Sequence, residues 1–250
     1  MKDLFGQWLD ALEKRHLSSL TFKEVRRSVQ ALSSLYVERR NRLPQGSALD
    51  GAGKRAAFAY YFSPLHFLLV REIVRNLKTG MSPASQIVDI GCGTGVAGAA
   101  WALEMEPTPR VVGVDRNSWA LAEAKWNCAQ FQLNAAFKCQ DFESFRIPRG
   151  SAVVGAFAIN ELMESARQRV LTAVISAARQ GSPILIVEPI ARRSALWWRE
   201  WMEAFCAAGG RADEWRFPME LPEKLALMDK SAGLDHRDLT GRSLWLGGYG

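Results

Sequence analysis

The chain has 250 residues, a net charge of +6 and a hydrophobic fraction of 48%. This length holds one full α/β domain of roughly 170 residues and a smaller region. The four cysteines form no close pair and the three histidines are dispersed, which argues against a disulfide framework or a metal site. No apolar run reaches the roughly 18 to 20 residues that cross a bilayer, so we expect a cytoplasmic protein without a membrane partner.

Charge is distributed unevenly along the chain. The first 80 residues contain 14 Lys or Arg and 7 Asp or Glu, whereas the rest contain 18 and 19. The excess of positive charge therefore belongs to the first third. A basic surface attracts phosphate backbones, so this asymmetry favours RNA as a partner, and a solvated helical face is the alternative. The densest basic stretch contains Arg26, Arg27, Arg39, Arg40 and Arg42.

Residues 1–79 are expected to form a helical region that recognises or covers a substrate. Thr21 and Glu24 have the spacing of a capping box before a helix that should end near residues 42–44. The aromatic run from Tyr60 to Phe62 precedes a further helix and is either a lid over a ligand or ordinary core. Apolar residues also recur at helical spacing at the start of the chain: Leu4, Phe5, Trp8, Leu9 and Leu12.

Three alternate glycines follow a short apolar strand over residues 87–90. Gly91, Gly93 and Gly95 lack Cβ atoms, so the backbone can turn sharply and a ligand can approach its N–H groups. A helix from about Val96 to Glu104 follows and directs its N-terminus at the same place. A dinucleotide loop would have a glycine where this chain has Val96, so pyrophosphate binding is not expected.

The G-x-G-x-G spacing, with Asp89 two residues before the first glycine, resembles motif I of the class I S-adenosylmethionine (SAM) methyltransferases. The resemblance implies an α/β, Rossmann-like fold with a seven-stranded, mostly parallel sheet and helices on both faces, preceded by the N-terminal helical region. Residues 80–250 would form this domain and bind SAM as cofactor. A tight turn without a ligand is the alternative. The candidate cofactor-binding residues of the loop are Asp89, Gly91, Cys92, Gly93 and Gly95.

A second strand, residues 111–114, ends at Asp115. A carboxylate at this tip can accept hydrogen bonds from two ribose hydroxyls, so we assign Asp115 to the ribose and include Arg116 among the cofactor-binding candidates. The alternative is that Asp115 or Asn117 caps the helix expected from Ser118 to Gln130.

A short strand over residues 135–138 leads to Asp141 and Phe142. This corner resembles the adenine-binding corner of the same superfamily, which implies that Asp141 accepts from the adenine amino group and that Phe142 contacts the ring. A solvated aspartate in a loop is the alternative for Asp141.

The apolar strand expected over residues 152–159 delivers Asn160 and Glu161 at its carboxyl end, where open α/β sheets bind ligands. Both are catalytic candidates, and Asn160 is also a cofactor-binding candidate. The Asn160 amide can donate or accept, and Glu161 can act as a base or an orienting carboxylate. A carboxylate at the start of a helix is also favourable through the helix dipole alone. The Asn-Pro-Pro-Tyr signature of base-amino methyltransferases is absent.

The alternation of elements continues to residue 246. We expect a helix over residues 166–179, a strand over residues 184–187, strands over residues 211–217 and 239–246, and a helix over residues 225–232. The spacing of three tryptophans on a further helix favours packing against the sheet over a base-stacking platform: Trp197, Trp198 and Trp201.

Asn160-Glu161-Leu162 and Ile186-Val187-Glu188-Pro189, together with the aromatic helix before the glycine loop, resemble the small-subunit ribosomal methyltransferase-like family of bacteria and mitochondria. The resemblance covers about residues 54–195 and implies an association with the small ribosomal subunit. Some members carry a C-terminal cysteine cluster implicated in iron–sulfur binding. Residues 205–250 contain only Cys206, so no such centre is expected.

These patterns together predict a SAM-dependent methyltransferase that acts on RNA, with ribosomal RNA favoured. Two alternatives remain open. The chain could methylate a small molecule covered by its N-terminal region, or it could be a SAM-binding ribosome assembly factor that transfers no methyl group.

Overall fold

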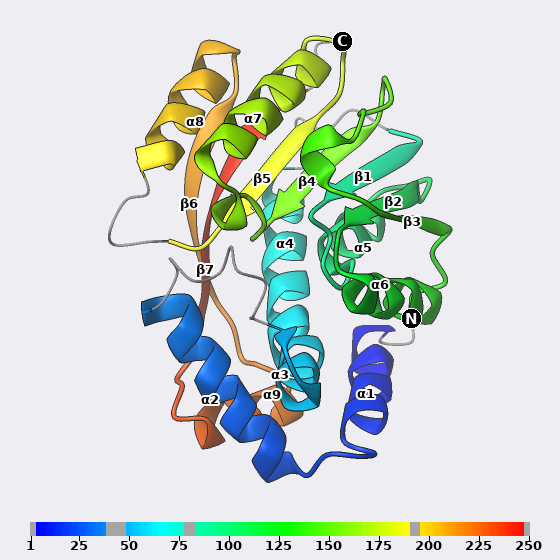
Figure 1. The fold of residues 1–250 in the computed structure, drawn as a ribbon, viewed down its shortest axis with the longest axis vertical. Helices are drawn as coiled ribbons and strands as arrows, with labels where there is room; N and C mark the ends of the chain where they lie inside the picture. The colour runs from blue at the N-terminus through cyan, green and yellow to red at the C-terminus, as the bar shows by residue number, and fades with distance from the viewer. Residues whose placement is uncertain (1–3, 39–48, 78–83, 191–195, 248–250) are drawn as a thin grey trace. The chain divides into compact units, whose positions relative to one another are not determined.

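The computed structural model describes residues 4–38, 49–77, 84–190 and 196–247 (Figure 1). The chain forms two compact units, one from Met1–His66 with Pro218–Leu239 and the other from Phe67–Phe217 with Thr240–Gly250. The sequence placed one division at residue 79. The observed division differs because a segment near the C-terminus returns to the N-terminal helices.

The first unit is helical. Its α2 begins with the expected capping box: the Thr21 N–H donates to Glu24 Oε2 at 2.8 Å, and the Glu24 N–H donates to Thr21 Oγ1 at 3.3 Å. The apolar stripe of α1 is buried, except for Leu4 at its start. The helices of this unit are α1 (Leu4–His16), α2 (Phe22–Glu38), α3 (Ala52–Ala57), the π-helical turn η3 (Phe58–Phe62) and α9 (Glu223–Ser231); α4 (Ser63–Leu77) begins here and continues into the second unit.

The aromatic run in η3 belongs to the core of the first unit. Tyr60 and Tyr61 are 1% and 0% exposed. The hydroxyl of Tyr61 donates to the carboxylate of Asp229, 168 residues further along the chain. Of the two expectations for this run, core packing is the one that the burial favours.

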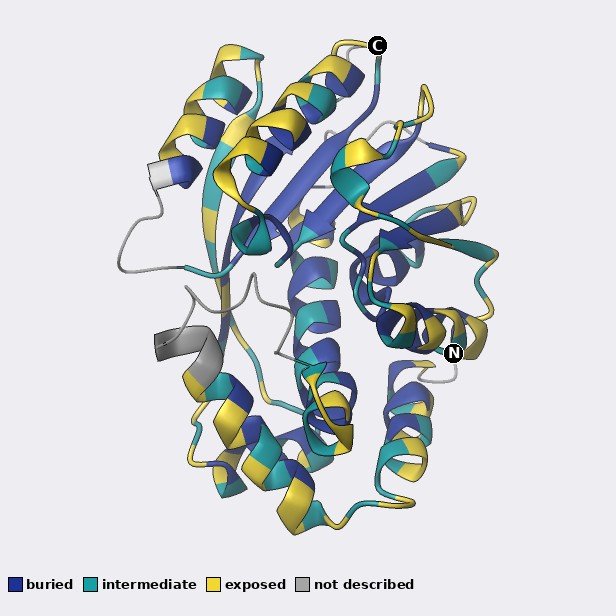
Figure 2. Cartoon of the chain, viewed as in Figure 1, coloured by how far each residue is buried: buried dark blue, intermediate teal, exposed yellow. Residues whose placement is uncertain are grey.

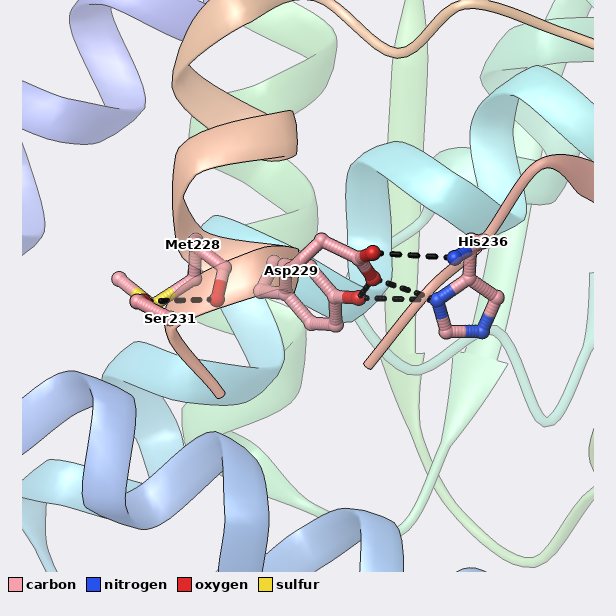
Figure 3. Close-up of polar contacts among 5 residues, drawn as sticks. Met228, Asp229, Ser231 and His236 are labelled. Carbon is pink, nitrogen blue, oxygen red and sulfur yellow. Dashed lines mark hydrogen bonds and ion pairs between the residues drawn. The ribbon is translucent and has the colours of Figure 1, made fainter. Parts of the chain in front are cut away.

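Asp229 joins the returning segment to these helices. Besides the Tyr61 hydroxyl, it accepts from the backbone N–H of His236 at 3.0 Å, and its Oδ1 lies 2.5 Å from His236 Nδ1. Figure 3 shows both oxygens of Asp229 turned toward His236. Burial raises the pKa of Asp229, but these donors outweigh it and the net pKa lies below the usual value. The ionised carboxylate is therefore the form that this cluster holds.

The second unit contains the expected seven-stranded sheet, in the order β3-β2-β1-β4-β5-β7-β6. The pairs among β1 to β5 are parallel, and β7 pairs antiparallel with β5. The order reverses between β1 and β4, which is where ligands bind in such sheets. The strands are β1 (Gln86–Ile90), β2 (Arg110–Asp115), β3 (Ala135–Cys139), β4 (Ala152–Ala156), β5 (Ile184–Glu188), β6 (Arg211–Pro218) and β7 (Asp238–Leu246).

Helices cover both faces of this sheet. Two of them, α7 (Glu164–Ala178) and α8 (Leu196–Ala207), pack on the face that carries Val88 and Ile186, and the three tryptophans of α8 are buried there as expected. The helix α5 (Val96–Ala102) lies on the other face, because its Gly98 contacts the Asp89 side chain. The central strands are buried throughout, as Figure 2 shows in dark blue. This burial explains their continuous apolar runs.

The strand β4 is shorter than the sequence predicts. It ends at Ala156, and Phe157 follows with a left-handed φ of +59°. This backbone conformation turns the chain out of the sheet, so residues 157–159 form a turn where the apolar run predicted a strand. Across the described part of the chain, no helix has the length and apolar character needed to span a membrane.

Candidate active site

The glycine bend lies between β1 and α5. Gly91, Gly93 and Gly95 all have a left-handed φ, at +63°, +50° and +75°. A Cβ added to Gly91 would lie 2.5 Å from the Cβ of Ala158, and one added to Gly95 would lie 2.9 Å from the Cβ of Ala124. Both conformation and space therefore require glycine at these two positions.

Asp115 supports this bend from the end of β2. Its Oδ2 accepts from the Gly93 N–H at 2.9 Å, and its Oδ1 accepts from the Asn117 N–H at 2.8 Å. Asn117, not Asp115, caps the helix α6 (Ser118–Gln130), because its side chain accepts from the Ala120 N–H at 3.1 Å. Each carboxylate oxygen has a further lone pair, so the geometry leaves Asp115 able to accept from a ligand.

Asp89 lies beneath the bend and is 1% exposed. Its Oδ2 accepts from the Gly98 N–H at 2.8 Å, whereas its Oδ1 has no hydrogen-bond partner among the described residues. Burial and the charge of Asp115 raise the pKa of Asp89 to about 7, against the opposing hydrogen bond from Gly98. Asp89 thus joins β1 to α5 and retains one oxygen that can accept.

Two other candidates contribute their backbone. The Cys92 thiol is buried, and burial raises its pKa well above the ordinary value, so it is no nucleophile. A Cβ on Gly113 would lie 2.8 Å from the Cys92 sulfur, so this side chain lies in the sheet layer. Arg116 is exposed, and its carbonyl accepts from the thiol of Cys139 at 3.6 Å.

The corner after β3 places Phe142 beside the bend. A Cβ on Gly91 would lie 3.0 Å from the Phe142 ring, which is half-buried. Asp141 is exposed, and its carbonyl accepts from the Ser144 hydroxyl at 2.8 Å in the 3-10 turn η5 (Phe142–Ser144). The aromatic candidate therefore lies next to the glycines, and the acidic one is open to solvent.

Asn160 is held from two sides in the 3-10 turn η6 (Ile159–Glu161), which follows β4. Its amide Nδ2 donates to Glu188 Oε2 at 2.9 Å, and its Oδ1 accepts from the indole N–H of Trp197 at 3.0 Å. Glu188 Oε1 also accepts from the backbone N–H groups of Ile159 and Asn160. Asn160 is thus fixed at the carboxyl edge of the parallel strands.

Glu161 is the titratable group best placed for proton transfer. Burial and the charge of Asp115 raise its pKa to about 7, and Arg116 opposes the shift. Asp115 at the end of β2 therefore lies close enough to Glu161, which follows β4, to affect its pKa. A carboxyl group with a pKa near neutrality can serve as a general base.

Glu188 and Trp197 are the polar partners that the sequence did not assign to the site. Trp197 was expected only to pack against the sheet, and Glu188 only to end a strand. The available signal was a carboxylate at the carboxyl end of a buried parallel strand, which is the same signal that pointed to Asp115.

The family comparison agrees with this geometry. Residues 87–181 match the family of methyltransferase domains. This part of the chain therefore resembles a methyltransferase domain, and it carries the glycine bend and the acidic strand ends expected of the class that uses SAM. The match covers β1 to the end of α7, and therefore every site residue named above except Glu188 and Trp197.

The methyltransferase domain also resembles curated proteins over part of their length. The chain is 27% identical over 118 residues to a carboxy-S-adenosyl-L-methionine synthase of Helicobacter pylori (strain Shi470), which covers 47% of this chain and 49% of that protein. It is 28% identical over 129 residues to the protein of the same name from Trichodesmium erythraeum (strain IMS101), covering 51% of each. The chain thus spans about half the length of the curated relatives it matches.

Among solved structures, mitomycin 7-O-methyltransferase MmcR is similar with a TM-score of 0.53 and 14% identity. The match covers 96% of this chain and 72% of that one. At this identity the likeness concerns the fold, which it extends beyond the methyltransferase domain to nearly the whole chain.

SAM is the cofactor that this domain implies, and the residues present fit it. Gly91, Gly93 and Gly95 hold the bend in a left-handed conformation that glycine adopts readily, and Ala158 and the Phe142 ring lie against Gly91. The carboxylate oxygens of Asp115 can accept from hydroxyl groups, and the Phe142 ring offers an aromatic wall. No group of three or more potential metal ligands occurs among the described residues.

Proposed function

We propose that this chain transfers a methyl group from SAM to RNA. The observation that carries the methyl transfer is the convergence, at the carboxyl ends of β1, β2 and β4, of the three-glycine bend, the Asp115 carboxylate and the Glu161 carboxyl group, whose pKa is about 7. The chain spans only half of its curated relatives, so the activity rests on this geometry.

The proposed cofactor contacts follow the order of the strands. The bend at Gly91, Gly93 and Gly95 would hold the methionine end, with Asp89 and Cys92 supporting it from below. Asp115 would accept from the ribose hydroxyls, next to Arg116. The corner at Asp141 and Phe142 would receive adenine.

Methyl transfer from SAM requires few catalytic side chains. SAM supplies an activated methyl carbon and a good leaving group. The chain aligns the acceptor and excludes water, and such positioning can be worth roughly 7 to 11 kcal/mol of the barrier. Asn160 would orient the reacting groups with its amide, and Glu161 would take the proton released by the acceptor.

RNA is proposed as the acceptor on grounds of charge, and the two units refine that argument. Residues 218–239 contain three Lys or Arg and five Asp or Glu, so joining them to residues 1–66 gives that unit a net charge of +3. The second unit then carries the remaining +3 of the total. Both units are basic, which favours a polyanionic acceptor over a neutral small molecule. Of the arginines singled out in the sequence, Arg39, Arg40 and Arg42 lie outside the described residues.

Transfer of tritium from methyl-labelled SAM to separated RNA, protein and metabolite fractions of an extract tests the proposal. Label in RNA, lost in the Asp115→Ala variant, is the expected result. Label in metabolites would instead identify a small-molecule methyltransferase. SAM binding without transfer to any fraction would identify an assembly factor.

Salt dependence provides a second test of the RNA proposal. RNA affinity should fall steeply with salt, and the slope should decrease when Arg26, Arg27, Arg39, Arg40 and Arg42 are changed to glutamine. Arg199→Gln is the control, since its side chain is 79% exposed on α8, where it pairs with Glu203. An equal slope in both variants would contradict binding through these arginines.

A further inference from the structure

We propose that Glu188 is a positioning residue that sets the orientation of the Asn160 amide, and through it the affinity for SAM. This inference rests on the proposed function, because it assumes that Asn160 faces the cofactor. Glu188 ends β5 and is 1% exposed, although no step of the proposed chemistry uses it.

The Glu188 carboxylate contacts the backbone of η6. Its Oε1 accepts from the N–H groups of Ile159 at 3.0 Å and of Asn160 at 3.2 Å. These two groups begin the turn, which has no side-chain cap of its own. A carboxylate on a neighbouring strand thus performs the work of an N-cap, and it fixes where Asn160 lies.

Glu188 and Trp197 together determine the orientation of the Asn160 amide. An ionised carboxylate only accepts hydrogen bonds and an indole N–H only donates one. With Glu188 on one side and Trp197 on the other, the amide NH2 must face the carboxylate and the amide oxygen must face the indole. One N–H and one lone pair of the amide remain beyond these two bonds, and their directions are thereby fixed.

The segment that carries Asn160 also contacts the glycine bend. The Phe157 N–H donates to the carbonyl of Val187 at 2.8 Å, so two consecutive residues of β5 hold the segment that leaves β4. Within that segment, the Cβ of Ala158 lies 2.5 Å from the place that a Cβ on Gly91 would take. A displacement of Asn160 would therefore also disturb the bend that holds the cofactor.

The charged groups around Glu188 make this arrangement sensitive to pH. Burial, with a smaller contribution from the charge of Glu161 on η6, raises the pKa of Glu188 to about 8. The backbone N–H groups of Asn160 and Ile159 and the charge of Arg242, its register partner on β7, oppose the shift. A protonated Glu188 would carry an O–H group and would be a weaker acceptor, so it would hold the Asn160 amide and the two backbone N–H groups less firmly. The ionised form is therefore the one that positions Asn160.

Titration calorimetry with SAM tests the inference on the full chain. We expect Glu188→Gln to weaken SAM binding about tenfold, because the new NH2 group would face the amide NH2 of Asn160. Asn160→Ala should have a similar effect, and the double variant should bind no more weakly than either single one, because both changes remove the same interaction. Glu203→Gln is the matched control, since Glu203 is exposed on α8.

The pH profile separates positioning from a merely structural role. Wild-type affinity should rise with pH until Glu188 ionises, near pH 8, and Glu188→Gln should remove that upper step. Additive effects in the double variant, or an unchanged upper step, would overturn the inference.

A Trp197 variant and the SAM binding of the wild-type chain complete the test. If Glu188→Gln does not fold, Trp197→Phe removes the opposing donor but keeps an aromatic ring in place, and it should also weaken SAM binding; unchanged affinity there would overturn the inference. A wild-type chain that binds no SAM would overturn the proposed function itself, whereas normal wild-type binding with unaffected variants would overturn only the role of Glu188.

Discussion

Two buried carboxylates, Asp229 in the first unit and Glu188 in the second, receive similar hydrogen bonds but differ in their pKa. Asp229 is 5% exposed and Glu188 is 1% exposed, and each is bonded through both oxygens. The pKa of Asp229 is nevertheless lowered, whereas that of Glu188 is raised to about 8.

The difference arises from the surroundings of each group. The hydrogen bond from the Tyr61 hydroxyl lowers the pKa of Asp229 most, and those from the backbone N–H and the ring of His236 add to it. Glu188 is more deeply buried, its donors are neutral amides, and Glu161 repels its charge. Asp229 thus stabilises the fold in its ionised form, whereas the ionised form of Glu188 is costly and predominates only above about pH 8.

The largest effect expected from this comparison is on the free energy of unfolding of Asp229→Ala. The change leaves the Tyr61 hydroxyl and the His236 amide without their acceptor, and we expect a loss of about 3 kcal/mol. Urea unfolding measures it. Asp235→Ala is the control, because that side chain is 72% exposed and should matter little. Equal losses in the two variants would remove the structural role given to Asp229.

The pH dependence of stability should have opposite signs in the two regions. The pKa values of Asp89 and Glu161 are raised to about 7 and that of Glu188 to about 8, so between pH 5 and 8 the folded chain holds protons that the unfolded chain has released. Stability must then fall as the pH rises, and we expect the melting temperature at pH 8.5 to be roughly 5 °C lower than at pH 5.5.

Asp229 contributes in the other direction. Its pKa is lowered from 3.8, so its contribution is complete above that pH and is lost as the pH falls below it. Calorimetric scans across the whole range should show a maximum between the two regimes, and Glu188→Gln should flatten only the alkaline side. A melting temperature that rises steadily to pH 8.5 would contradict the raised pKa values.

Asp115→Ala tests a third carboxylate, which is half-buried and accepts from two backbone N–H groups. We expect SAM binding to weaken by roughly 1 to 3 kcal/mol, because the ribose hydroxyls would lose a charged acceptor. Calorimetry with SAM measures the change. Asn117→Ala, which removes only the cap of α6, should affect stability more than affinity. Unchanged affinity in Asp115→Ala would refute the ribose assignment.

The smallest effect is expected for Tyr61→Phe. The change removes one of the donors to Asp229 and leaves the ring in place, so the free energy of unfolding should fall by about 1 kcal/mol. The acid limb of the stability profile should also move to higher pH, because the hydroxyl lowers the pKa of Asp229. A loss as large as that of Asp229→Ala would mean that the tyrosine, not the carboxylate, organises this cluster.

Local patterns were sufficient to predict most of the sheet and the bend. The strands β1, β2, β4 and β5 are mostly buried apolar runs that end in turns. Three alternate glycines after a strand indicate a bend with left-handed residues. The same holds for the capping box at Thr21 and Glu24. These features depend on residues that are close together in the chain.

Features that depend on distant residues were not predicted. The bond between Tyr61 and Asp229 joins positions 168 residues apart, and with it the assignment of residues 218–239 to the first unit. The contact of Glu188 with Asn160 spans 28 residues, and no periodicity signals it. The left-handed φ of Phe157 was not predicted, because the apolar run in the sequence continues past the end of β4.

The route of the chain through its two units has a consequence for its synthesis. The helical unit needs residues 218–239, and the sheet needs β7, which follows β6 in the chain but lies between β5 and β6 in the sheet. Neither unit can complete its native contacts until residues 218–246 have left the ribosome. Nascent chains that stop at residue 217 should therefore expose the apolar surfaces of both units and require chaperones.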